Sequence, residues 1–466
     1  MNLNTTDNNC GVSFTSLGGT DRDYQNLSKI ANTPIAELAK INPALLIFPQ
    51  VLGAHDDGIE EQEIFNLHGD SEKLENVLLK TGNLMGFIGI GGTQLKITSR
   101  FSSDDKSDYF LHYMLQKVFS INLFDWEHST SNDSQLDLLM FAFPLLLKKA
   151  LAQGIFRQYQ TFNRNDANVK GVIDVSRHIR HNIPFGGKIA YKSRERTIDN
   201  PLIELIRHTI EYIRTKTFAK EILTNDPETK ICVQEIIEAT QSYDIHNREK
   251  VIAQNLKPIT HPYYTAYKPL QNLCLSILRH KKIGYGNSKN KAYGILFDGA
   301  WLWEEYLATI LVPAGFKHPR NKAADGAIKV YDGNPRYPDF YKGKQMERLQ
   351  TSESNFVLDA KYKHLDNHRP GSDEISGCFS RDDLHQLITY MYILPAKQGG
   401  LIYPYDKADK RNNPEIIISK PKNLYGYGGQ IATYGIPIPT KENYSDFIEH
   451  MKSIETNLRS PLCPTT

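Results

Sequence analysis

Apolar residues recur at strand or helix spacing along most of the chain, and these runs predict its elements. Two apolar runs between residues 82 and 101 flank the Gly89–Gly92 turn, which predicts a tight β-hairpin. A further group of strands is predicted over 169–192. Helical spacing predicts helices over the ranges 108–123, 135–153, 202–214 and 263–281. The amino-terminal half is therefore expected to be α+β first and then mostly helical.

The carboxy-terminal half shows a helix, a strand and a second helix, in that order. Residues Phe297–Leu311 have an apolar face spaced for a helix that ends at Pro313. The apolar run before Asp359 predicts a buried strand. Ser380 has the form of a helix cap, and the helix that it starts is expected to reach Leu394. These three elements carry the polar residues of most chemical interest.

Asp359 and Lys361 stand at the end of the predicted strand and point to the same face, because side chains alternate along a strand. Asp339, which follows Pro338 earlier in the chain, supplies a second carboxylate. Two carboxylates suit a hard cation such as Mg²⁺, and a neighbouring ammonium can orient water or offset charge on a phosphate. The set indicates metal-dependent hydrolysis of phosphodiesters. An ordinary ion pair at a strand end is the simpler alternative.

Both flanking helices add polar residues to this set. Glu304 and Glu305 lie about 100° apart around a helix axis, so only one of them can face the site. Gln386 and Tyr390 are four positions apart and share one helix face, where the amide can both donate and accept hydrogen bonds. A partly exposed helix flank would show the same spacing.

The order of these motifs, helix-Glu, Pro-Asp, Asp-x-Lys and Gln-x-x-x-Tyr, resembles the PD-(D/E)xK nuclease superfamily in its version with a Gln-x-x-x-Tyr helix. The resemblance implies an α/β, restriction-endonuclease-like domain: a mixed sheet flanked by helices, with the active site at strand ends. It implies Mg²⁺, or Mn²⁺ in its place, as cofactor. The implied metal ligands are Asp339, Asp359 and Glu304, and the implied catalytic set is Asp339, Asp359, Lys361, Glu304, Gln386 and Tyr390.

More narrowly, the chain resembles the McrC family, the nuclease subunits of McrBC and LlaJI-type restriction systems. The resemblance places the family's helix glutamate on Glu304 rather than Glu305, and implies an AAA+ NTPase partner of the McrB type. Two departures are Tyr337, where the family often has Arg, and a long polar interval before Asp359, which suggests a hairpin with an extended tip. The matching segments are Phe297-Asp298, Trp303–Tyr306, Tyr337–Asp339, Leu358–Tyr362, Gly86–Ile90, Leu95–Phe101, Gly171–Arg180 and Arg194–Asn200.

Three regions are expected. Residues 1–80 form an amino-terminal extension of unknown role, residues 81–285 an α+β and helical partner-docking region, and residues 286–466 the nuclease domain. The last boundary falls in a basic stretch, Arg279–Lys282 with Lys289 and Lys291, which suits a solvated linker or a phosphate-binding strip. A second basic cluster suits phosphate, an acidic partner surface or solubility alone: Arg177, His178, Arg180, His181, Arg194 and Arg196.

Composition narrows the function classes. The 466 residues are 40% hydrophobic and 23% charged, with 55 Lys and Arg against 53 Asp and Glu, so DNA contacts must come from local patches. The five cysteines are isolated and indicate neither a zinc site nor a disulfide framework. No Gly-Lys-Ser/Thr loop is present, so the chain is not expected to bind NTP by itself. The absence of a secretory signal and of a long apolar run predicts a cytoplasmic protein without membrane contact.

The leading hypothesis is the DNA endonuclease subunit of an NTP-dependent restriction system. It would cut double-stranded DNA with Mg²⁺, and the partner would read 5-methylcytosine or, in a LlaJI-like system, unmodified sites. Two alternatives stay open: an autonomous endonuclease or repair nuclease, and a non-catalytic activator or scaffold of an AAA+ motor.

Overall fold

A five-stranded sheet joins the amino-terminal residues to the start of the carboxy-terminal half. In the computed structural model its strand order is β1-β7-β6-β11-β3. The predicted hairpin is present, with β6 antiparallel to β7. β1 runs parallel to β7, and β11 pairs antiparallel with β6 and parallel with β3. The bounds are β1 Asn2–Thr6, β3 Leu45–Phe48, β6 Leu84–Ile90, β7 Thr93–Thr98 and β11 Tyr293–Asp298.

The structure describes residues 2–42, 45–49, 59–69, 74–102, 108–119, 134–216, 222–224, 226–283, 292–319, 327–331, 335–343, 352–364, 380–405, 416–426, 428–441 and 443–462. Two compact units result: residues 1–130 with 286–466, and residues 131–285. This division differs from the expected three regions because β1 and β11 belong to the same sheet as the 84–98 hairpin. We call the two parts unit 1 and unit 2.

The amino-terminal part of unit 1 packs a small sheet and two short helices against the five-stranded sheet. The small sheet has the order β2-β5-β4. Side chains from both sheets and both helices form one apolar core, in which Phe14, Phe65 and Leu84 are fully buried. The bounds are β2 Val12–Ser13, β4 Phe65–His68, β5 Leu78–Thr81, α1 Asp21–Leu27 and α2 Ile35–Ile41, with short 3-10 helices at Ile59–Glu61 and Leu74–Asn76.

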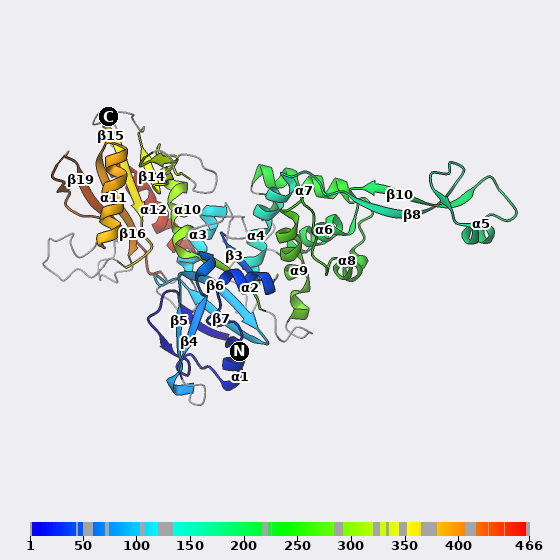
Figure 1. Cartoon of the computed structure of the whole chain (residues 1–466), viewed down its shortest axis with the longest axis horizontal. Coiled ribbons are helices and arrows are strands. Elements are labelled where there is room, and N and C mark those ends of the chain that lie inside the picture. Colours follow the sequence, from blue (N-terminus) through cyan, green and yellow to red (C-terminus); the bar gives the residue numbers. More distant parts are fainter. Residues whose placement is uncertain are drawn as a thin grey trace. The chain divides into compact units, whose positions relative to one another are not determined.

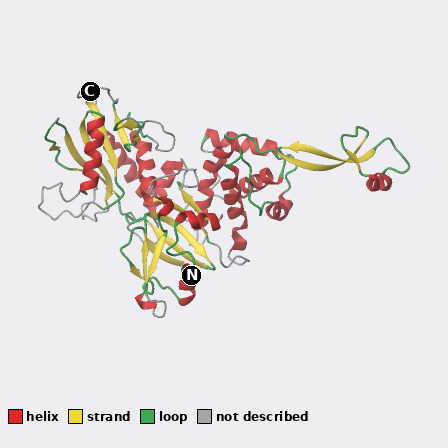
Figure 2. Ribbon diagram, viewed as in Figure 1, coloured by secondary structure: helices red, strands yellow, loops and turns green. Residues whose placement is uncertain are grey.

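The carboxy-terminal part of unit 1 is a mixed sheet with the order β14-β15-β16-β19-β17 (Figures 1 and 2). β14 Phe340–Lys342 is antiparallel to β15 Ser352–Ala360, and β15, β16 and β19 are mutually parallel. The hairpin expected after Asp339 is thus present, and its tip lies outside the described residues. The other bounds are β12 Ile328–Lys329, β13 Pro335–Arg336, β16 Ala396–Tyr405, β17 Ile417–Ile418, β18 Lys422–Asn423 and β19 Gln430–Pro437.

Helices cover this mixed sheet. α11 Arg381–Ile393 begins at the predicted cap, since Ser380 accepts a hydrogen bond from Asp383 N, and its apolar face packs on β15 and β16. α10 spans Gly299–Leu311, two residues shorter than predicted, because Phe297 and Asp298 end β11 and the Asp298 side chain caps the helix. The remaining helices of unit 1 are α3 Tyr109–Phe119 and α12 Tyr444–Leu462.

Unit 2 is a group of helices from which a long hairpin extends (Figure 1). The predicted helix start at residue 200 is confirmed: the Asn200 side chain caps α6, with Pro201 in its first turn. Pro144 lies inside the predicted apolar helix. The helix bounds are α4 Ser134–Leu151, α6 Pro201–Arg214, α7 Pro227–Ala239, α8 Arg248–Gln254 and α9 Tyr267–Ile283, with a 3-10 turn at Ile245–Asn247.

The hairpin, which we call the arm, corrects the prediction of strands over 169–192. Its ladder joins β8 Gln158–Asp166 to β10 Ile189–Thr197, and β9 Val172–Ile173 adds two pairs. Between them lies a short helix, α5 Val175–His181, where Asp174 accepts a hydrogen bond from Arg177 N. The prediction missed this helix because the capping residue Asp174 marks its start, whereas its apolar residues are too few to show a helical period.

No helix in the described part of the chain combines the length and hydropathy needed to cross a membrane. The described cysteines Cys10, Cys232 and Cys274 are free thiols, and Cys378 and Cys463 lie outside the described residues.

Candidate active site

β15 places Asp359 and Lys361 at the edge of the mixed sheet. The Asp359 side chain is completely buried, and Lys361 Nζ lies 2.7 Å from Asp359 Oδ2. The backbone stays paired with the neighbouring strand here, because Lys361 N donates a hydrogen bond of 2.9 Å to Ile402 O of β16. As strand alternation predicted, the carboxylate and the ammonium share one face.

β14 brings Asp339 beside this pair. Phe340 pairs with Leu358, so Asp339 lies next to Asp359 across the antiparallel ladder. Asp339 Oδ2 accepts a hydrogen bond of 2.6 Å from Ala360 N. The charge of Asp339 acts on Asp359 and raises its pKa, as expected of two acids held close together.

The two neighbouring glutamates of α10, Glu304 and Glu305, have different surroundings. Glu304 faces the acidic group, since the charges of Asp339 and Asp359 act on it. Glu305 turns to His318, whose Nε2 lies 3.9 Å from Glu305 Oε1. The two glutamates thus differ in their surroundings, and Glu304 is the one on which the charges of Asp339 and Asp359 act.

α11 completes the arrangement from the other side. Lys361 Nζ donates a hydrogen bond of 3.3 Å to Gln386 Oε1, and Gln386 Nε2 donates one of 3.2 Å to the Tyr390 hydroxyl. A chain of contacts therefore runs from Asp359 through Lys361 and Gln386 to Tyr390. The structure gathers all six candidate residues into one site.

Burial raises the pKa of each of the three carboxyl groups, and like charges add to this effect at Asp359 and Glu304. Burial and the charge of Asp339 raise the pKa of Asp359 to about 8, against a pull from Lys361. The same two causes raise the pKa of Glu304 well above its usual value, and burial raises that of Asp339. Although burial alone would lower it, the charges of Asp359 and Asp339 raise the pKa of Lys361. The cluster is therefore short of positive charge.

The donor chemistry of this cluster suits Mg²⁺. Both Asp359 oxygens are buried, and apart from the adjacent carboxyl and ammonium no donor among the described residues satisfies them with good hydrogen-bond geometry. Carboxylate oxygens are the ligands that Mg²⁺ prefers. Among the described residues, no group of three His, Cys, Asp or Glu side chains is close enough together to hold a metal ion. Asp339 and Asp359 form a pair, with Glu304 facing them.

Three further residues at the site were not found from the sequence. Asp383, at the start of α11, pairs with Lys363 Nζ and lies 3.8 Å from Lys361 Nζ. His318 Nδ1 lies 2.8 Å from Asp339 O, and its ring stacks on Phe340. The alternation that put Lys361 on the face of Asp359 also puts Lys363 there, so that signal was available. No sequence motif includes His318, because only the tertiary fold brings it close to Asp339.

Arg279 of the first basic cluster lies on α9 of unit 2. Lys289 and Lys291 fall outside the described residues. The cluster at 177–196 lies on the arm, where Arg164 forms an exposed pair with Glu195 and Lys192 one with Asp174.

A family model described as McrBC 5-methylcytosine restriction system component matches residues 79–404. A search of curated proteins found no match. The chain is similar to one in a refined half-complex from a tetradecameric assembly of Thermococcus gammatolerans McrB AAA+ hexamers with bound McrC, with 15% identity, 97% of this chain and 100% of that chain covered, and a TM-score of 0.48.

A second similar chain comes from the cryo-EM structure of the Thermococcus gammatolerans McrBC complex. Identity is 14%, with 69% of this chain and 90% of that chain covered, and the TM-score is 0.33.

Proposed function

Since the chain belongs to the family of McrBC 5-methylcytosine restriction system components, we propose that it is the DNA-cutting subunit of such a system and hydrolyses phosphodiester bonds of double-stranded DNA. The observation that carries the proposal is the cluster of Asp339, Lys361 and the fully buried Asp359 at the end of β15, with Glu304 near it. A scaffold gains nothing from burying like charges, which destabilise the fold. Such clusters are typical of active sites. The domain would be a PD-(D/E)xK nuclease domain.

Each residue has a role that follows from its position. Asp339 and Asp359 would hold Mg²⁺, with Glu304 reaching it directly or through water; the bound ion would polarise the phosphate and the attacking water. Lys361 stays charged, because its acidic neighbours raise its pKa. Its ammonium orients the water or offsets charge that grows on the phosphate oxygens.

Gln386 and Tyr390 act on the ammonium. Gln386 accepts a hydrogen bond from Lys361 and donates one to Tyr390, so it limits the positions that the lysine can take. Asp383 Oδ1 lies 3.8 Å from the same ammonium. The lysine is thereby aimed before the substrate arrives, which lowers the cost of ordering it in the transition state.

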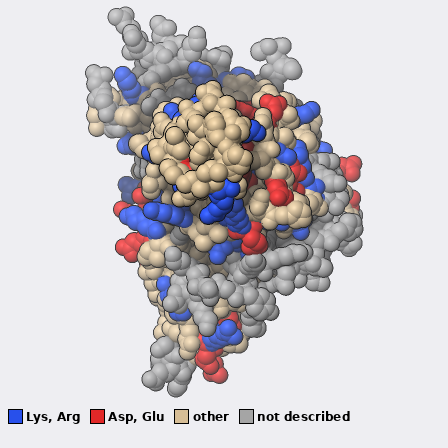
Figure 3. All heavy atoms as spheres, turned by 90° about the vertical axis from the view of Figure 1, so that its right-hand side faces the viewer, with Lys and Arg blue, Asp and Glu red and all other residues tan. Residues whose placement is uncertain are grey.

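We further propose that an AAA+ NTPase of the McrB type supplies the motor. The sequence has no NTP-binding loop of its own, and the arm of unit 2 exposes a group of large apolar side chains that water alone would not favour. Figure 3 views the end of the arm and shows mostly uncharged surface there, with Lys and Arg side chains beside it. The exposed residues are Tyr159, Val169, Val172, Ile173, Val175, Ile179, Ile183 and Phe185.

Plasmid cleavage with purified components tests the proposal. The protein is assayed with and without its AAA+ partner, with Mg²⁺ and NTP, on methylated and unmethylated DNA. We expect cutting that requires the partner and NTP and disappears in Lys361→Ala and Asp359→Ala. Replacement of a catalytic group of this kind costs about a hundredfold or more in rate. The exposed charge substitution Arg214→Gln, on α6 of unit 2, serves as the control.

Three outcomes would count against the proposal. Cutting by the chain alone would indicate an autonomous endonuclease or repair nuclease. Stimulation of the NTPase without cutting by the wild-type protein would indicate an activator or scaffold. Cutting that survives both substitutions would show that this cluster is not the active site.

A further inference from the structure

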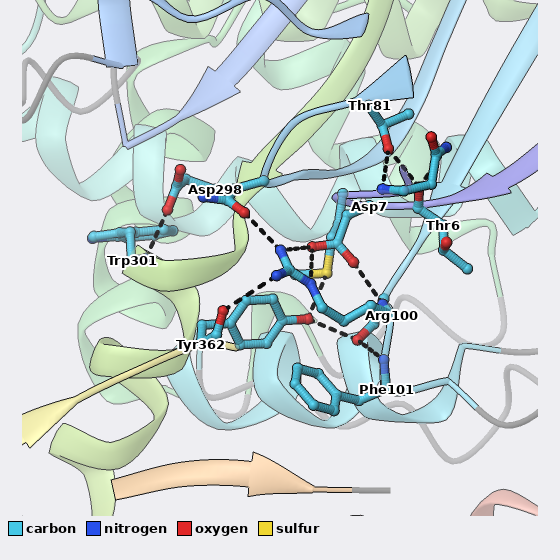
Figure 4. Close-up of polar contacts among 12 residues, drawn as sticks. Thr6, Asp7, Thr81, Arg100, Phe101, Asp298, Trp301 and Tyr362 are labelled. Carbon is cyan, nitrogen blue, oxygen red and sulfur yellow. Dashed lines mark hydrogen bonds and ion pairs between the residues drawn. The ribbon is translucent and has the colours of Figure 1, made fainter. Parts of the chain in front are cut away.

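Tyr362, the residue after Lys361, is held by residues from the amino-terminal sheet. It is almost fully buried, and its hydroxyl lies 2.7 Å from Ser99 Oγ and 3.2 Å from Met85 Sδ (Figure 4). Its ring packs edge-on against Phe101, with centroids 5.1 Å apart. The strand that carries a candidate catalytic group therefore ends among residues from a distant part of the chain. We call these residues, Met85, Ser99, Arg100 and Phe101, the socket.

Arg100 is the centre of that socket. Its guanidinium lies over the Tyr362 ring, with Cζ 4.9 Å from the centroid, and Nη1 donates a 3.4 Å hydrogen bond to Tyr362 O. On its other side Nε and Nη2 donate to Asp7 Oδ2 at 2.9 and 2.5 Å, and Nη2 donates to Asn83 Oδ1 at 2.6 Å. The guanidinium is thus fixed in its plane by partners on both sides.

Asp7 is a buried carboxylate committed to this arginine. Its side chain is inaccessible, and Oδ1 accepts a hydrogen bond of 2.6 Å from Arg100 N. It follows β1 directly, and Asp7 N donates to Thr98 O. Burying an ion pair costs much desolvation free energy and is weak evidence for stability alone. Such a pair fixes geometry instead.

Tyr362 also lies close to the helix of Glu304. Gly299, the first residue of α10, lies so close to Tyr362 that an added Cβ would sit 2.6 Å from ring atom Cε1. Gly299 N donates to Asn83 O, next to the Arg100 contact. Tyr362 is therefore the point where the strand of Lys361 and the helix of Glu304 meet the amino-terminal sheet.

We propose that Arg100, fixed by Asp7, is a positioning residue of the candidate active site: it holds the strand at Tyr362 and thereby aims the Lys361 ammonium at Asp359. This rests on the proposed function for its catalytic consequence but not for its geometry. Lys361 lies between two anchors, its own N bonded to Ile402 O and the next residue held by Arg100. Residues 2–7, assigned to an extension of unknown role, acquire a function in the site.

The test compares Arg100→Lys, the double variant Asp7→Asn/Arg100→Gln and Tyr362→Phe with the wild type. Arg100→Lys keeps a charge for Asp7 but loses the fork. The double variant removes the guanidinium without leaving a buried charge, which guards against simple unfolding. Tyr362→Phe removes the hydroxyl contacts alone. Arg214→Gln, which breaks an exposed pair with Glu211, is the control.

Two readouts are required. In the partner complex we expect kcat for DNA cleavage to fall about tenfold to a hundredfold in the Arg100 variants, with KM for DNA and NTPase stimulation within about twofold, since small misplacements of a catalytic group cost this much. Tyr362→Phe should show a smaller loss in kcat.

The second readout needs no cleavage. Acetylation of Lys361 by acetic anhydride, followed by mass spectrometry, should become several times faster in the Arg100 variants. Acetylation of Lys117, which pairs with Glu455 in the same unit, should stay unchanged. Unchanged kcat and Lys361 labelling, or equal gains at Lys117, would overturn the positioning role. If the wild type does not cut DNA, the proposed function fails, and the Lys361 labelling still decides this inference.

Discussion

His208 is a buried residue whose protonation opposes folding. It lies on α6 with 1% of its surface exposed, and burial, followed by the charge of Arg248, lowers its pKa to about 4. In the unfolded chain a histidine has a pKa of about 6.5. Between these two values the unfolded chain binds the additional proton. The stability of unit 2 must therefore fall as pH falls through this window.

We expect the free energy of unfolding of unit 2 to decrease by about 1.4 kcal/mol for each pH unit between roughly 6 and 4 from this residue. His208→Phe, which keeps a ring beside Tyr243, should remove that dependence. Urea titrations at pH 7 and pH 5, read by pulse labelling of the buried Cys274 thiol with a dipyridyl disulfide, measure it. His246→Gln is the exposed control. Equal pH slopes for wild type and His208→Phe would contradict the prediction.

At the residue scale, the sequence was enough to predict which side chains share one face of a strand or a helix. Strand alternation placed Asp359 and Lys361 on one face, and they form an ion pair. Helical spacing related Gln386 to Tyr390, and they share a hydrogen bond. It could not predict that Arg100 reaches Tyr362, because that contact joins residues 262 positions apart. Such contacts are determined by tertiary packing, which cannot be inferred from a short stretch of sequence.

α12 is tied to two other helices by one carboxylate. Glu455 accepts hydrogen bonds from Tyr113 and Tyr306, at 2.7 and 3.1 Å, and pairs with Lys117 at 2.6 Å. Tyr306 belongs to α10, the helix of Glu304. Loss of the carboxylate would leave these buried donors without their acceptor.

We expect Glu455→Ala to lower the free energy of unfolding of unit 1 by about 2–4 kcal/mol, since buried polar networks lose this much when one member is removed. The exposed change Glu449→Ala on the same helix should stay within about 0.5 kcal/mol. Urea denaturation followed by tryptophan fluorescence reports on it, because buried Trp303 packs beside Tyr306 on α10. A cost for Glu455→Ala no larger than that of Glu449→Ala would contradict the network's role.

At the element scale, caps were the most reliable signal. Asn200 with Pro201, and Ser380 with Asp383, mark the starts of α6 and α11 as predicted. Asp298 shows the limit of the method, because the apolar run before it continues into α10 and hides the change from strand to helix. The pairing of β16 with β15 and β19 was not predictable either. Parallel strands pair only across a long connection, which contains α11 between β15 and β16 and the strands β17 and β18 between β16 and β19.

The arm carries most of the exposed large apolar side chains described in unit 2, and its proposed role in docking the AAA+ partner can be tested on the whole molecule. Val172 and Phe185 are 79% and 65% exposed, so charge there should leave the fold intact. We expect Val172→Asp/Phe185→Asp to weaken binding of the AAA+ partner more than tenfold, because apolar anchors contribute most of the affinity of an interface. NTPase stimulation and partner-dependent DNA cleavage should fall with it.

Ile231→Asp, 67% exposed on α7, provides a matched control. Binding measured by interferometry should be unaffected by this substitution. An arm variant that binds the partner as tightly as wild type would exclude the apolar arm as the docking element. Loss of binding in both variants would indicate a broader surface on unit 2.

At this scale the composition of the sequence does not show which distant strands share a sheet. The expected boundaries followed composition along the chain, whereas the sheet β1-β7-β6-β11-β3 collects strands from residues 2–6, 45–48, 84–98 and 293–298. Pairing between distant strands leaves no compositional trace. Unit 2 is thus an insertion between two halves of unit 1.

This insertion imposes an order on biosynthesis. Among the described strands β3 pairs with β11 alone, so it has no neighbour until residues 293–298 leave the ribosome. At about 5–20 residues per second, the chain between β7 and β11 takes on the order of ten seconds or more to emerge. During that interval the contiguous unit 2 can finish folding while the sheet that supports the candidate active site stays incomplete. A nascent chain would then carry its folded arm before the residues of the candidate active site are assembled.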